Sequence, residues 1–471
     1  MTKLEQRLQS AASDLNRHVR SAFAVPKPGL ERLPRRLNRL AVAAATAAVC
    51  LVSLIAIALI APFGPDAPVA DEPGIVAPTG STSPGTTPAS PAGSPYAWTR
   101  VADPDLGGEG NQEIYSIRGV SSGLIAVGED RYSPAVWASE DGLDWHRVND
   151  ATDAFGSEQS PYGEDSRRWL LDIAEGNGRL VAIGIDVLHR PGESHVKIDP
   201  AVKVMAFWYS DDYGSTWARV PDDGDAFRLG SGPLRSDARI IATPTGFLAV
   251  GEAIWTSPDG GSWTRANVPG SYVSDAIATG TAILAVGAVG PDDEWAYREA
   301  AWYSTDGTNW KSAGVETAPS FQGRFAAMAE TGDGYFALGS GSRRLVWFST
   351  DGFTWTFRGG YEENDGYAAD QVHDIIAVDD TIVAVGAREA YLATAATVWE
   401  STDGGFTWTV REDQDVFGNP RSESRQSEAF SIVKFEDHII VGGSFGNNLA
   451  QRGLLEGNGD AAVWVGTPTD Y

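Results

Sequence analysis

Short apolar stretches that end in glycine recur along most of the chain and alternate with polar turns. LIAVG at 124–128 is typical of them, and the seven copies end at Gly128, Gly184, Gly251, Gly287, Gly339, Gly386 and Gly442. Each repeating unit holds four apolar runs of strand length. The commonest spacing between units is 47 residues, as from Trp208 to Trp255 (255 − 208 = 47). This period is typical of a four-stranded propeller blade.

The tryptophans indicate how such a series of blades can close. Seven leading tryptophans follow the glycine motif, at Trp137, Trp208, Trp255, Trp302, Trp347, Trp399 and Trp464, and six trailing ones follow a polar turn, at Trp145, Trp217, Trp263, Trp310, Trp355 and Trp408. Trp464 has no trailing partner, but Trp98 lies 47 residues before Trp145 (145 − 98 = 47) and can supply it. We therefore predict an all-β, seven-bladed β-propeller over residues 96–471, in which N- and C-terminal strands complete one blade. The alternative is an open solenoid, which would leave sheet edges unpaired.

The turn between paired tryptophans carries Ser and Asp at fixed spacing. An Asp carboxylate can accept hydrogen bonds from nearby backbone N–H groups, Gly takes a positive φ without steric cost, and Ser bonds locally at the entry of the turn. The six turns contain Ser139, Asp141 and Trp145; Ser210, Asp212, Gly214 and Trp217; Ser257, Asp259 and Trp263; Ser304, Asp306 and Trp310; Ser349, Asp351 and Trp355; and Ser401, Asp403, Gly405 and Trp408. Because six equivalent carboxylates do not make one special environment, we expect a structural role for them rather than catalysis.

These turns resemble the Asp box, or bacterial neuraminidase repeat, of the sialidase superfamily. The segments 210–217 and 401–408 match its form SxDxGxTW in full, and the other four are one residue shorter, SxDGxxW. The whole pattern also resembles bacterial single-span membrane proteins with VWxSxDGxxW repeats, a resemblance that implies no particular activity.

The first 95 residues differ from the repeats in composition. Residues 1–39 form a basic tail with an apolar stripe at helical spacing, which we expect to be cytoplasmic and partly helical. Residues 40–61 hold no charged side chain and are long enough for a transmembrane helix. Residues 62–95 are rich in Pro, Gly, Ser and Thr, as in an extended linker. The positive flank predicts a signal-anchor in the cell membrane with the propeller outside; a cleaved secretory signal is the alternative.

Charge and cysteine content exclude several classes of function. The net charge is −27, and residues 1–40 carry nine Lys or Arg against three acidic residues, or +6, so the remainder carries −27 − 6 = −33. This argues against a nucleic-acid partner, which requires clustered Lys and Arg. The single cysteine, Cys50, excludes a disulfide scaffold and a Cys-based zinc site. We expect no cofactor and no metal, because His189 and His195 have no evident third ligand.

Four insertions provide the candidate binding surface. They lie at 149–168, 185–203, 412–428 and 443–460, and alternation of strand direction places them on one face of the ring, beside the first blade. Long loops on a rigid scaffold often bind ligands. The candidate residues are Arg118 on the first inner strand, with Tyr162, Arg167, Arg168, Trp169, His189, Arg190, His195, Arg421 and Arg425. Such a basic and aromatic group suits a carboxylated glycan or an acidic protein; functionless solvated loops are the alternative.

Three functions fit the sequence. The first is a membrane-anchored, extracytoplasmic recognition or assembly propeller without catalysis of its own. The second is a glycoside hydrolase, since the sialidase resemblance implies an arginine cluster, a Tyr activated by Glu, and an Asp acid. Arg118 in YSIRGV is the nearest counterpart of the first arginine, but the family's following Pro is absent and no nucleophile can be named. The third is a transmembrane sensor that signals through the cytoplasmic tail.

Overall fold

The computed structural model describes part of the chain from Ser94 to Thr469. The described ranges are 94–131, 133–148, 153–156, 166–188, 202–221, 226–230, 238–266, 272–290, 297–318, 323–340, 344–361, 369–390, 393–411, 413–418, 426–447 and 458–469. The chain divides into Met1–Pro88 and Ala89–Tyr471, and all of these ranges belong to the second unit. The predicted tail, transmembrane helix and nearly all of the linker therefore lie outside the described residues. Within the ranges given, no helix is long and apolar enough to cross a membrane.

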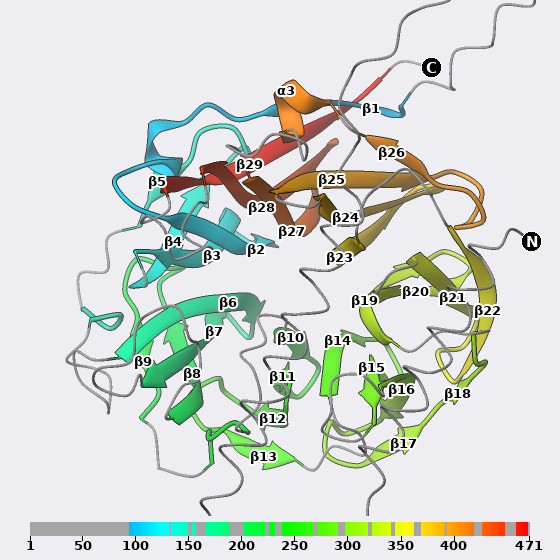
Figure 1. Cartoon of the computed structure of the whole chain (residues 1–471). Helices are drawn as coiled ribbons and strands as arrows, with labels where there is room; N and C mark the ends of the chain where they lie inside the picture. Colours follow the sequence, from blue (N-terminus) through cyan, green and yellow to red (C-terminus); the bar gives the residue numbers. More distant parts are fainter. Residues whose placement is uncertain are drawn as a thin grey trace, which may run out of the picture. The chain divides into compact units, whose positions relative to one another are not determined.

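The described strands form seven separate sheets around a common centre (Figure 1). Blade 1 contains β2 (Gln112–Val120), β3 (Gly123–Asp130), β4 (Ser133–Ser139) and β5 (His146–Arg147); blade 2 contains β6 (Ser166–Gly176), β7 (Arg179–Leu188), β8 (Val202–Ser210) and β9 (Ala218–Arg219); blade 3 contains β10 (Arg239–Thr243), β11 (Gly246–Val250), β12 (Ile254–Ser257) and β13 (Thr264–Ala266); blade 4 contains β14 (Tyr272–Ala278), β15 (Ile283–Val289), β16 (Arg298–Ser304) and β17 (Trp310–Ser312). Blade 5 contains β19 (Arg324–Thr331), β20 (Gly334–Ser340), β21 (Arg344–Ser349) and β22 (Thr354–Tyr361), with β18 (Gly314–Val315) as a fifth, parallel strand that the sequence did not predict; blade 6 contains β23 (Ala369–Val378), β24 (Thr381–Ala390), β25 (Ala393–Ser401) and β26 (Thr409–Arg411); blade 7 contains β27 (Gln426–Phe435), β28 (His438–Asn447), β29 (Asn458–Pro468) and β1 (Tyr96–Arg100). The connections hold the short helices η1 (Pro104–Leu106) and α3 (Gln414–Phe417). The prediction of an all-β, seven-bladed propeller is confirmed.

The two ends of the folded region meet in blade 7. β1 pairs antiparallel with β29, so that Trp98 lies opposite Gly466 and Arg100 opposite Trp464. The Trp98 indole N–H donates to the Glu400 carboxylate of blade 6 at 3.1 Å, and Glu400 also receives the Arg411 guanidinium at 2.8 Å. The predicted closure by the termini is thus confirmed, and Trp98 also joins blade 7 to blade 6.

The Ser and Asp turns are closed by the same bonds in six blades of the described chain. In blade 1 the Ser139 Oγ accepts the Gly142 N–H at 2.8 Å, and the Asp141 carboxylate accepts the backbone N–H of Leu143 at 2.8 Å and of Asp144 at 2.9 Å. The Trp145 indole N–H then donates to the Gly142 carbonyl at 3.0 Å. Equivalent bonds occur in the turns that begin at Ser210, Ser257, Ser304, Ser349 and Ser401. These carboxylates serve the turns themselves.

The leading tryptophans hold the connections between blades. Each is nearly completely buried, and in five of the described blades its indole N–H donates to a backbone carbonyl of the connection that enters the blade. The bonded pairs are Trp137 with Asp105, Trp208 with Ala154, Trp255 with Ala226, Trp347 with Glu316, and Trp464 with Val416. A buried indole needs such a partner. In these five blades, the strand that carries the leading tryptophan therefore binds the connection that leads into the same blade.

The repeated glycine permits a bulge in the inner strand. In six described blades the register shifts at one inner-strand position, and a glycine of the second strand lies directly opposite the residue before it. A Cβ atom on Gly128 would lie 1.8 Å from the Glu113 carbonyl, and one on Gly386 would lie 1.8 Å from the Gln371 carbonyl. In blade 7 this position belongs to Gly443, one residue beyond the Gly442 of the sequence repeat. The glycine is thus required by the close approach of two strands.

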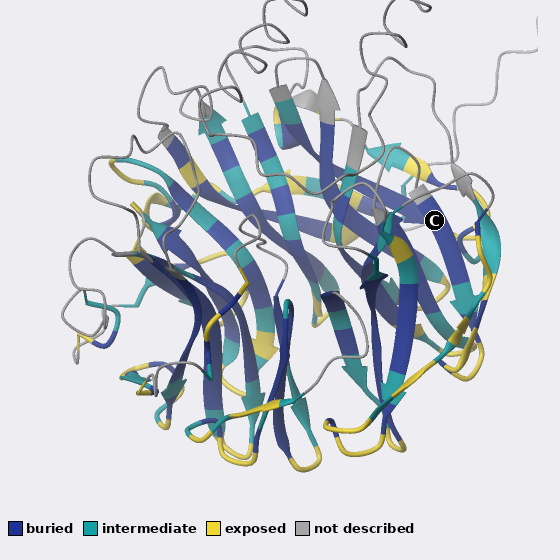
Figure 2. Ribbon diagram, turned by 60° about the horizontal axis from the view of Figure 1, so that its bottom comes forward, coloured by how far each residue is buried: buried dark blue, intermediate teal, exposed yellow. Residues whose placement is uncertain are grey.

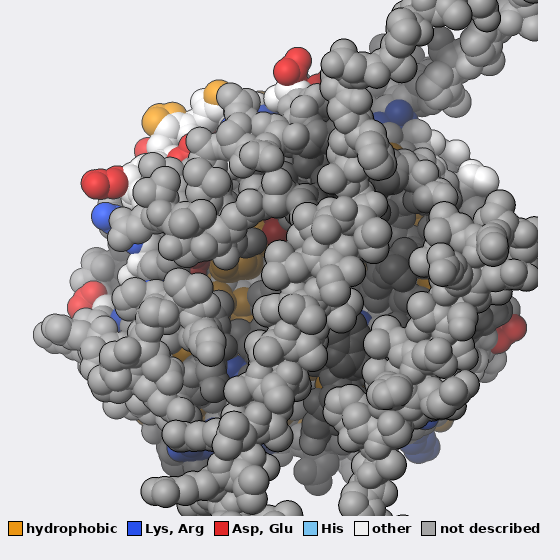
Figure 3. Space-filling view, in the orientation of Figure 1, with side chains coloured by type: hydrophobic (Ala, Val, Ile, Leu, Met, Phe, Trp, Pro, Cys, Tyr) orange, Lys and Arg blue, Asp and Glu red, His pale blue; other side chains and the backbone are white. Residues whose placement is uncertain are grey.

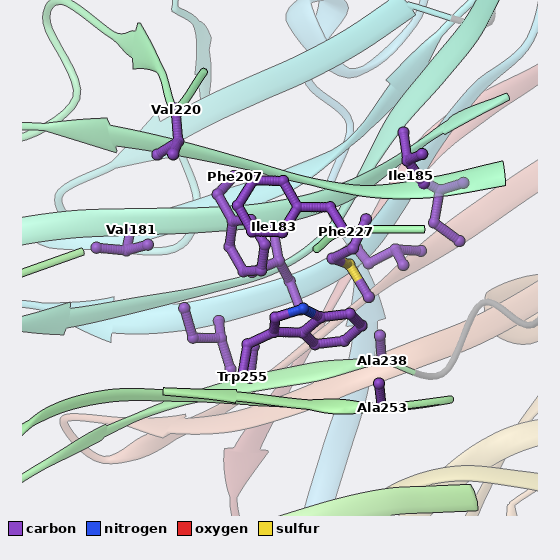
Figure 4. Packing of buried hydrophobic residues seen from close by; sticks show 14 of the residues in the cluster. Val181, Ile183, Ile185, Phe207, Val220, Phe227, Ala238, Ala253 and Trp255 are labelled. Atoms are coloured by element: carbon purple, nitrogen blue, oxygen red, sulfur yellow. The ribbon is translucent and has the colours of Figure 1, made fainter. Parts of the chain in front are cut away.

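Apolar side chains fill the space between neighbouring blades. The largest cluster lies between blades 2 and 3, where Phe207 packs against Phe227 at 5.0 Å and against Trp255 at 6.1 Å between ring centroids (Figure 4). Side chains from β7, β8 and β11 complete it. Because the sheets are stacked face to face in this way, each blade presents its inner strand to the centre of the ring.

We expect Trp98→Ala to lower the free energy of unfolding by about 3 kcal/mol, because it removes packing in blade 7 and leaves the buried Glu400 carboxylate without one donor. Urea denaturation of the full chain in detergent measures this. Thr99→Ala, at an exposed position of the same strand, is the matched control and should change stability by less than about 0.5 kcal/mol. Equal stability of the two variants would contradict the role of Trp98 in closure.

Candidate functional site

The two faces of the ring differ in their connections. The hairpins between first and second strands and the Ser and Asp turns lie on one face, which we call the turn face; Figure 2 shows them as short exposed loops along one side. The inner strands begin on the opposite face, which we call the loop face, and the chain segments with the predicted insertions start there. Most residues of those insertions lie outside the described ranges.

A narrow pocket lies at the mouth of the central channel on the loop face. It is lined by Tyr115, Arg239, Arg324, Ala326, Val372, His373 and Phe430, and about 20 Å³ is open to a water-sized sphere. Tyr115, Ala326, His373 and Phe430 are the bulged residues of β2, β19, β23 and β27. Bulges redirect side chains, and here they turn four blades' side chains into one pocket. In the orientation of Figure 1, hydrophobic and some charged side chains are visible between the parts of the view drawn in grey (Figure 3).

Two polar pairs flank an aromatic ring in this pocket. The Tyr115 hydroxyl donates to the Glu113 carboxylate at 2.6 Å, and His373 Nε2 lies 2.8 Å from the Glu428 carboxylate. The Phe430 ring lies between them, 5.2 Å from the Tyr115 ring and 5.2 Å from the His373 ring. The rings fix one wall of the pocket, and the pairs place acceptors and donors beside it.

Arginines from the opposite blades form the other wall. The Arg239 guanidinium of β10 crosses the mouth and donates to the His373 carbonyl at 3.0 Å. Arg324 enters from the first residue of β19, with its guanidinium 5.6 Å from the Tyr272 ring. Burial raises the pKa of Asp275 in β14 to about 7, while the charge of Arg239 opposes that rise. This wall of the pocket is therefore basic, and the Asp275 carboxyl group neutralises part of the positive charge of Arg239.

An ion network spans the channel beneath the pocket. Arg118 lies three residues farther along β2 than Tyr115, and its guanidinium lies 3.2 Å from Asp172 of blade 2 and 3.5 Å from Asp374 of blade 6. Both carboxylates also accept backbone N–H groups, Asp172 from Ile240 at 3.0 Å and Asp374 from Ile432 at 3.1 Å. These carboxylates raise the pKa of Arg118 against the opposing effect of burial. Arg118 therefore joins blades across the floor of the pocket.

A pair of glutamates stands behind Tyr115. Glu129 of β3 lies directly opposite Glu113 of β2, and the Asn111 amide donates to both carboxylates, at 3.0 Å to Glu113 and 3.4 Å to Glu129. Burial and the charge of Glu113 raise the pKa of Glu129 to about 8, and Arg167 opposes this rise. Burial also raises the pKa of Glu113. Near neutral pH the pair therefore retains a proton, which avoids two adjacent buried charges.

Four of the ten predicted ligand-binding residues are described, and they lie in different environments. Arg118 lies in the channel floor, Arg167 acts on Glu129 beside the mouth, Arg168 is buried and donates to the Gly156 carbonyl, and Trp169 packs against the core between blades 2 and 3. The other candidates, Tyr162, His189, Arg190, His195, Arg421 and Arg425, lie outside the described residues. Of the four candidates that the structure describes, Arg118 lies beneath the pocket on β2, the strand of Tyr115, and Arg167 interacts electrostatically with Glu129.

Sequence reasoning missed Tyr115, His373, Phe430, Arg239 and Arg324. For Tyr115 and His373 the missing signal was the glycine repeat, because Gly128 and Gly386 lie opposite the residue immediately before a bulge. For Phe430 the corresponding glycine is Gly443, one residue beyond the repeat, and no such signal marks Arg239 or Arg324. Among the described residues, no group of three His, Cys, Asp or Glu side chains could hold a metal ion.

The wild type should lose stability as the pH rises, because Glu129 must then ionise. We expect Glu129→Gln, which cannot ionise, to lack this loss. An unfolded Glu titrates near pH 4.5, whereas Glu129 in the folded chain holds its proton to about pH 8. Protonated Glu129 therefore contributes its full stabilisation below about pH 4.5, and this contribution is lost as the pH rises through about 8. The melting temperature of the wild type should fall by several degrees relative to Glu129→Gln between about pH 5 and about pH 9. Glu140→Gln, at an exposed turn, should follow the wild type; parallel profiles for all three proteins would contradict the assignment.

No family model and no curated protein matches the chain. Similar solved structures include one described as "YCF48 bound to D1 peptide" (16% identity, 80% of this chain and 98% of that chain, TM-score 0.47). Others are the GH93 α-L-arabinofuranosidase of Fusarium graminearum with arabinobiose (14%, 79% and 98%, 0.43) and the Trypanosoma rangeli sialidase with the inhibitor DANA (13%, 78% and 59%, 0.42). At these identities and TM-scores, the likenesses carry no inference about what this chain binds or does.

Proposed function

We propose that the chain is a membrane-anchored, extracytoplasmic recognition propeller that binds its ligand at the channel mouth on the loop face. The observation that carries this proposal is the pocket itself, in which two arginines face two polar pairs and an aromatic ring. Convergence of such groups in one concave place is typical of a binding site. The Asp-box resemblance of the turns fits a scaffold role, since their carboxylates are used within the turns.

The size and charge of the pocket favour a narrow acidic group as the part of the ligand that enters. The space within the pocket is about 20 Å³, too little to enclose a sugar ring. Arginine presents paired donors that suit a carboxylate. We infer that a carboxylate of an acidic protein or glycan inserts beside Arg324, while the rest of the ligand lies over the mouth.

The surroundings of Tyr115 favour binding over catalysis. Burial and the charges of Glu113 and Glu129 raise the pKa of Tyr115 well above its usual value. A phenolate nucleophile is therefore disfavoured there. Tyr115 is better suited to donate a hydrogen bond than to attack a substrate.

We expect Arg324→Gln to weaken binding of a carboxylate probe at least tenfold. Isothermal titration with N-acetylneuraminate and with a tetraglutamate peptide supplies a glycan and a peptide carboxylate. Arg265→Gln, on the outer strand β13 and away from the channel, is the matched control and should bind as the wild type does. If neither probe binds the wild type, or if both variants bind equally well, the carboxylate proposal fails.

We expect the full chain to remain in the membrane pellet after alkaline carbonate extraction. The physical reason is the apolar segment 40–61, which can place about 30 Å of hydrocarbon-compatible helix in the bilayer. Exchanging Leu51 and Leu59 for Asp should release the chain, whereas exchanging them for Val should not. Protease added outside sealed cells should digest the propeller and spare the tail; recovery of the wild type in the soluble fraction would contradict the anchor.

Glycoside hydrolysis remains a second candidate because of one contact. A Tyr hydroxyl 2.6 Å from a Glu carboxylate, beside two arginines, has the parts that the sialidase resemblance implies. The pocket volume and the raised pKa of Tyr115 weigh against it. Hydrolysis of a fluorogenic sialoside that disappears in Tyr115→Phe would favour the enzyme.

A further inference from the structure

The large apolar side chains that are exposed in the described part of the propeller all lie on the turn face. They are Leu143 (50% exposed), Tyr213 (55%), Phe353 (39%) and Phe406 (64%). Each stands next to the glycine of a Ser and Asp turn, at its tip. Single exposed apolar residues need no explanation, but the restriction of these four to equivalent tips on one face does.

The four tips occupy one arc of the ring. They belong to blades 5, 6, 1 and 2, which flank blade 7, whereas the tips of blades 3 and 4 carry Gly261 and Thr308 after the turn glycine. β1, the outer strand of blade 7, begins at Tyr96 opposite Pro468, close to the hairpin that joins β27 to β28 on the turn face. The predicted linker therefore joins the propeller at the middle of the arc.

Ser94, two residues before that strand, is held in place by hydrogen bonds. The Ser94 hydroxyl donates to the Glu400 carboxylate at 2.9 Å, and its carbonyl accepts the Thr469 hydroxyl at 2.9 Å. The attachment point is thus bonded to blade 6 through Glu400 and to the end of blade 7 through Thr469. A linker of 34 residues has a root-mean-square length of about 30 Å, which corresponds to an effective concentration in the millimolar range. Even a weak contact between the tips and a nearby surface would then be populated.

We propose that Leu143, Tyr213, Phe353 and Phe406 dock the turn face shallowly on the outer surface of the bilayer that holds the anchor. This inference rests on the proposed membrane anchor. Apolar and aromatic side chains on separate projecting tips suit a deformable lipid interface better than a matched protein groove. The neighbouring carboxylates Asp141, Asp351 and Asp403 accept backbone N–H groups that lower their pKa values, so they remain charged and disfavour anionic lipid. We therefore assign a zwitterionic headgroup surface as the partner.

The test uses the full chain in phosphatidylcholine nanodiscs. With Cys50 replaced by Ala, a fluorophore is attached to a single cysteine at the exposed tip of Phe406→Cys or, as the matched control, at the equivalent tip Thr308→Cys of blade 4, outside the arc. A spin label on the lipid headgroup should quench the fluorophore at position 406 at least threefold more than at position 308. Adding Leu143→Ser, Tyr213→Ser and Phe353→Ser should reduce quenching at 406 to the level of 308. Replacing a third of the lipid by phosphatidylserine should weaken quenching.

The contrary outcomes are distinct. Equal quenching at the two positions in a chain that resists carbonate extraction would overturn the docking and leave the anchor intact. A label at 406 that is shielded without lipid quenching and transfers energy to a second labelled copy would assign the arc to self-association instead. Stronger quenching in phosphatidylserine would contradict the zwitterionic partner. Failure of the chain to enter nanodiscs would overturn both the anchor and this inference.

Discussion

The propeller depends on hydrogen bonds that inner-strand side chains make across the gap between neighbouring blades. Within the described chain the seven sheets are separate, so backbone pairing alone does not join them. Just after the bulge, a side chain reaches the next inner strand and accepts a backbone N–H that would otherwise be buried without a partner. The pairs are Asp172 with Ile240, Asp275 with Met328, Asp374 with Ile432, and Ser431 with Ile117. In β23 and β27 the bulge has two consequences, since it turns one residue toward the adjacent blade and the preceding one, His373 or Phe430, toward the channel mouth. In β6 and β14 the preceding residues, Leu171 and Ser274, are buried instead. The stability of the ring and the composition of the pocket share this cause.

The fold could be predicted from the sequence because its determinants are local and repeated. A tryptophan spacing of 47 residues placed Trp98 in the last blade, and pairing of β1 with β29 follows that spacing. The Ser, Asp and Gly of each turn satisfy one another within a few residues, so their motif carries its own structural explanation. β18 escaped prediction because it is short and is defined by a partner about 40 residues later in the chain.

The site could not be predicted in the same way, because its residues come from five blades and the side chains at equivalent positions differ from blade to blade. Arg118 illustrates the difficulty. An arginine on an inner strand was a reasonable candidate for ligand binding, but the choice between ligand and structure depends on Asp172 and Asp374, which are 54 and 256 residues away in the sequence. Trp169 was likewise predicted to bind ligand because it lies at the end of an insertion. In the structure it packs against the core formed by blades 2 and 3. The type of a side chain limits the interactions that it can make. Which of these it makes in the folded chain depends on neighbours that are distant in the sequence.

The way in which the ring closes also determines how the two faces can be used. Strands within a blade alternate in direction, so each strand contributed by the N-terminus moves the start of the chain to the other face. This chain contributes a single outer strand, β1, and therefore begins the propeller on the turn face, where β29 also ends. Closure by two N-terminal strands would have brought the linker to the loop face, beside the pocket. With one strand, the attachment point at β1 and the channel mouth lie on opposite sides of the ring, so that closure and pocket draw on different faces of the same blades.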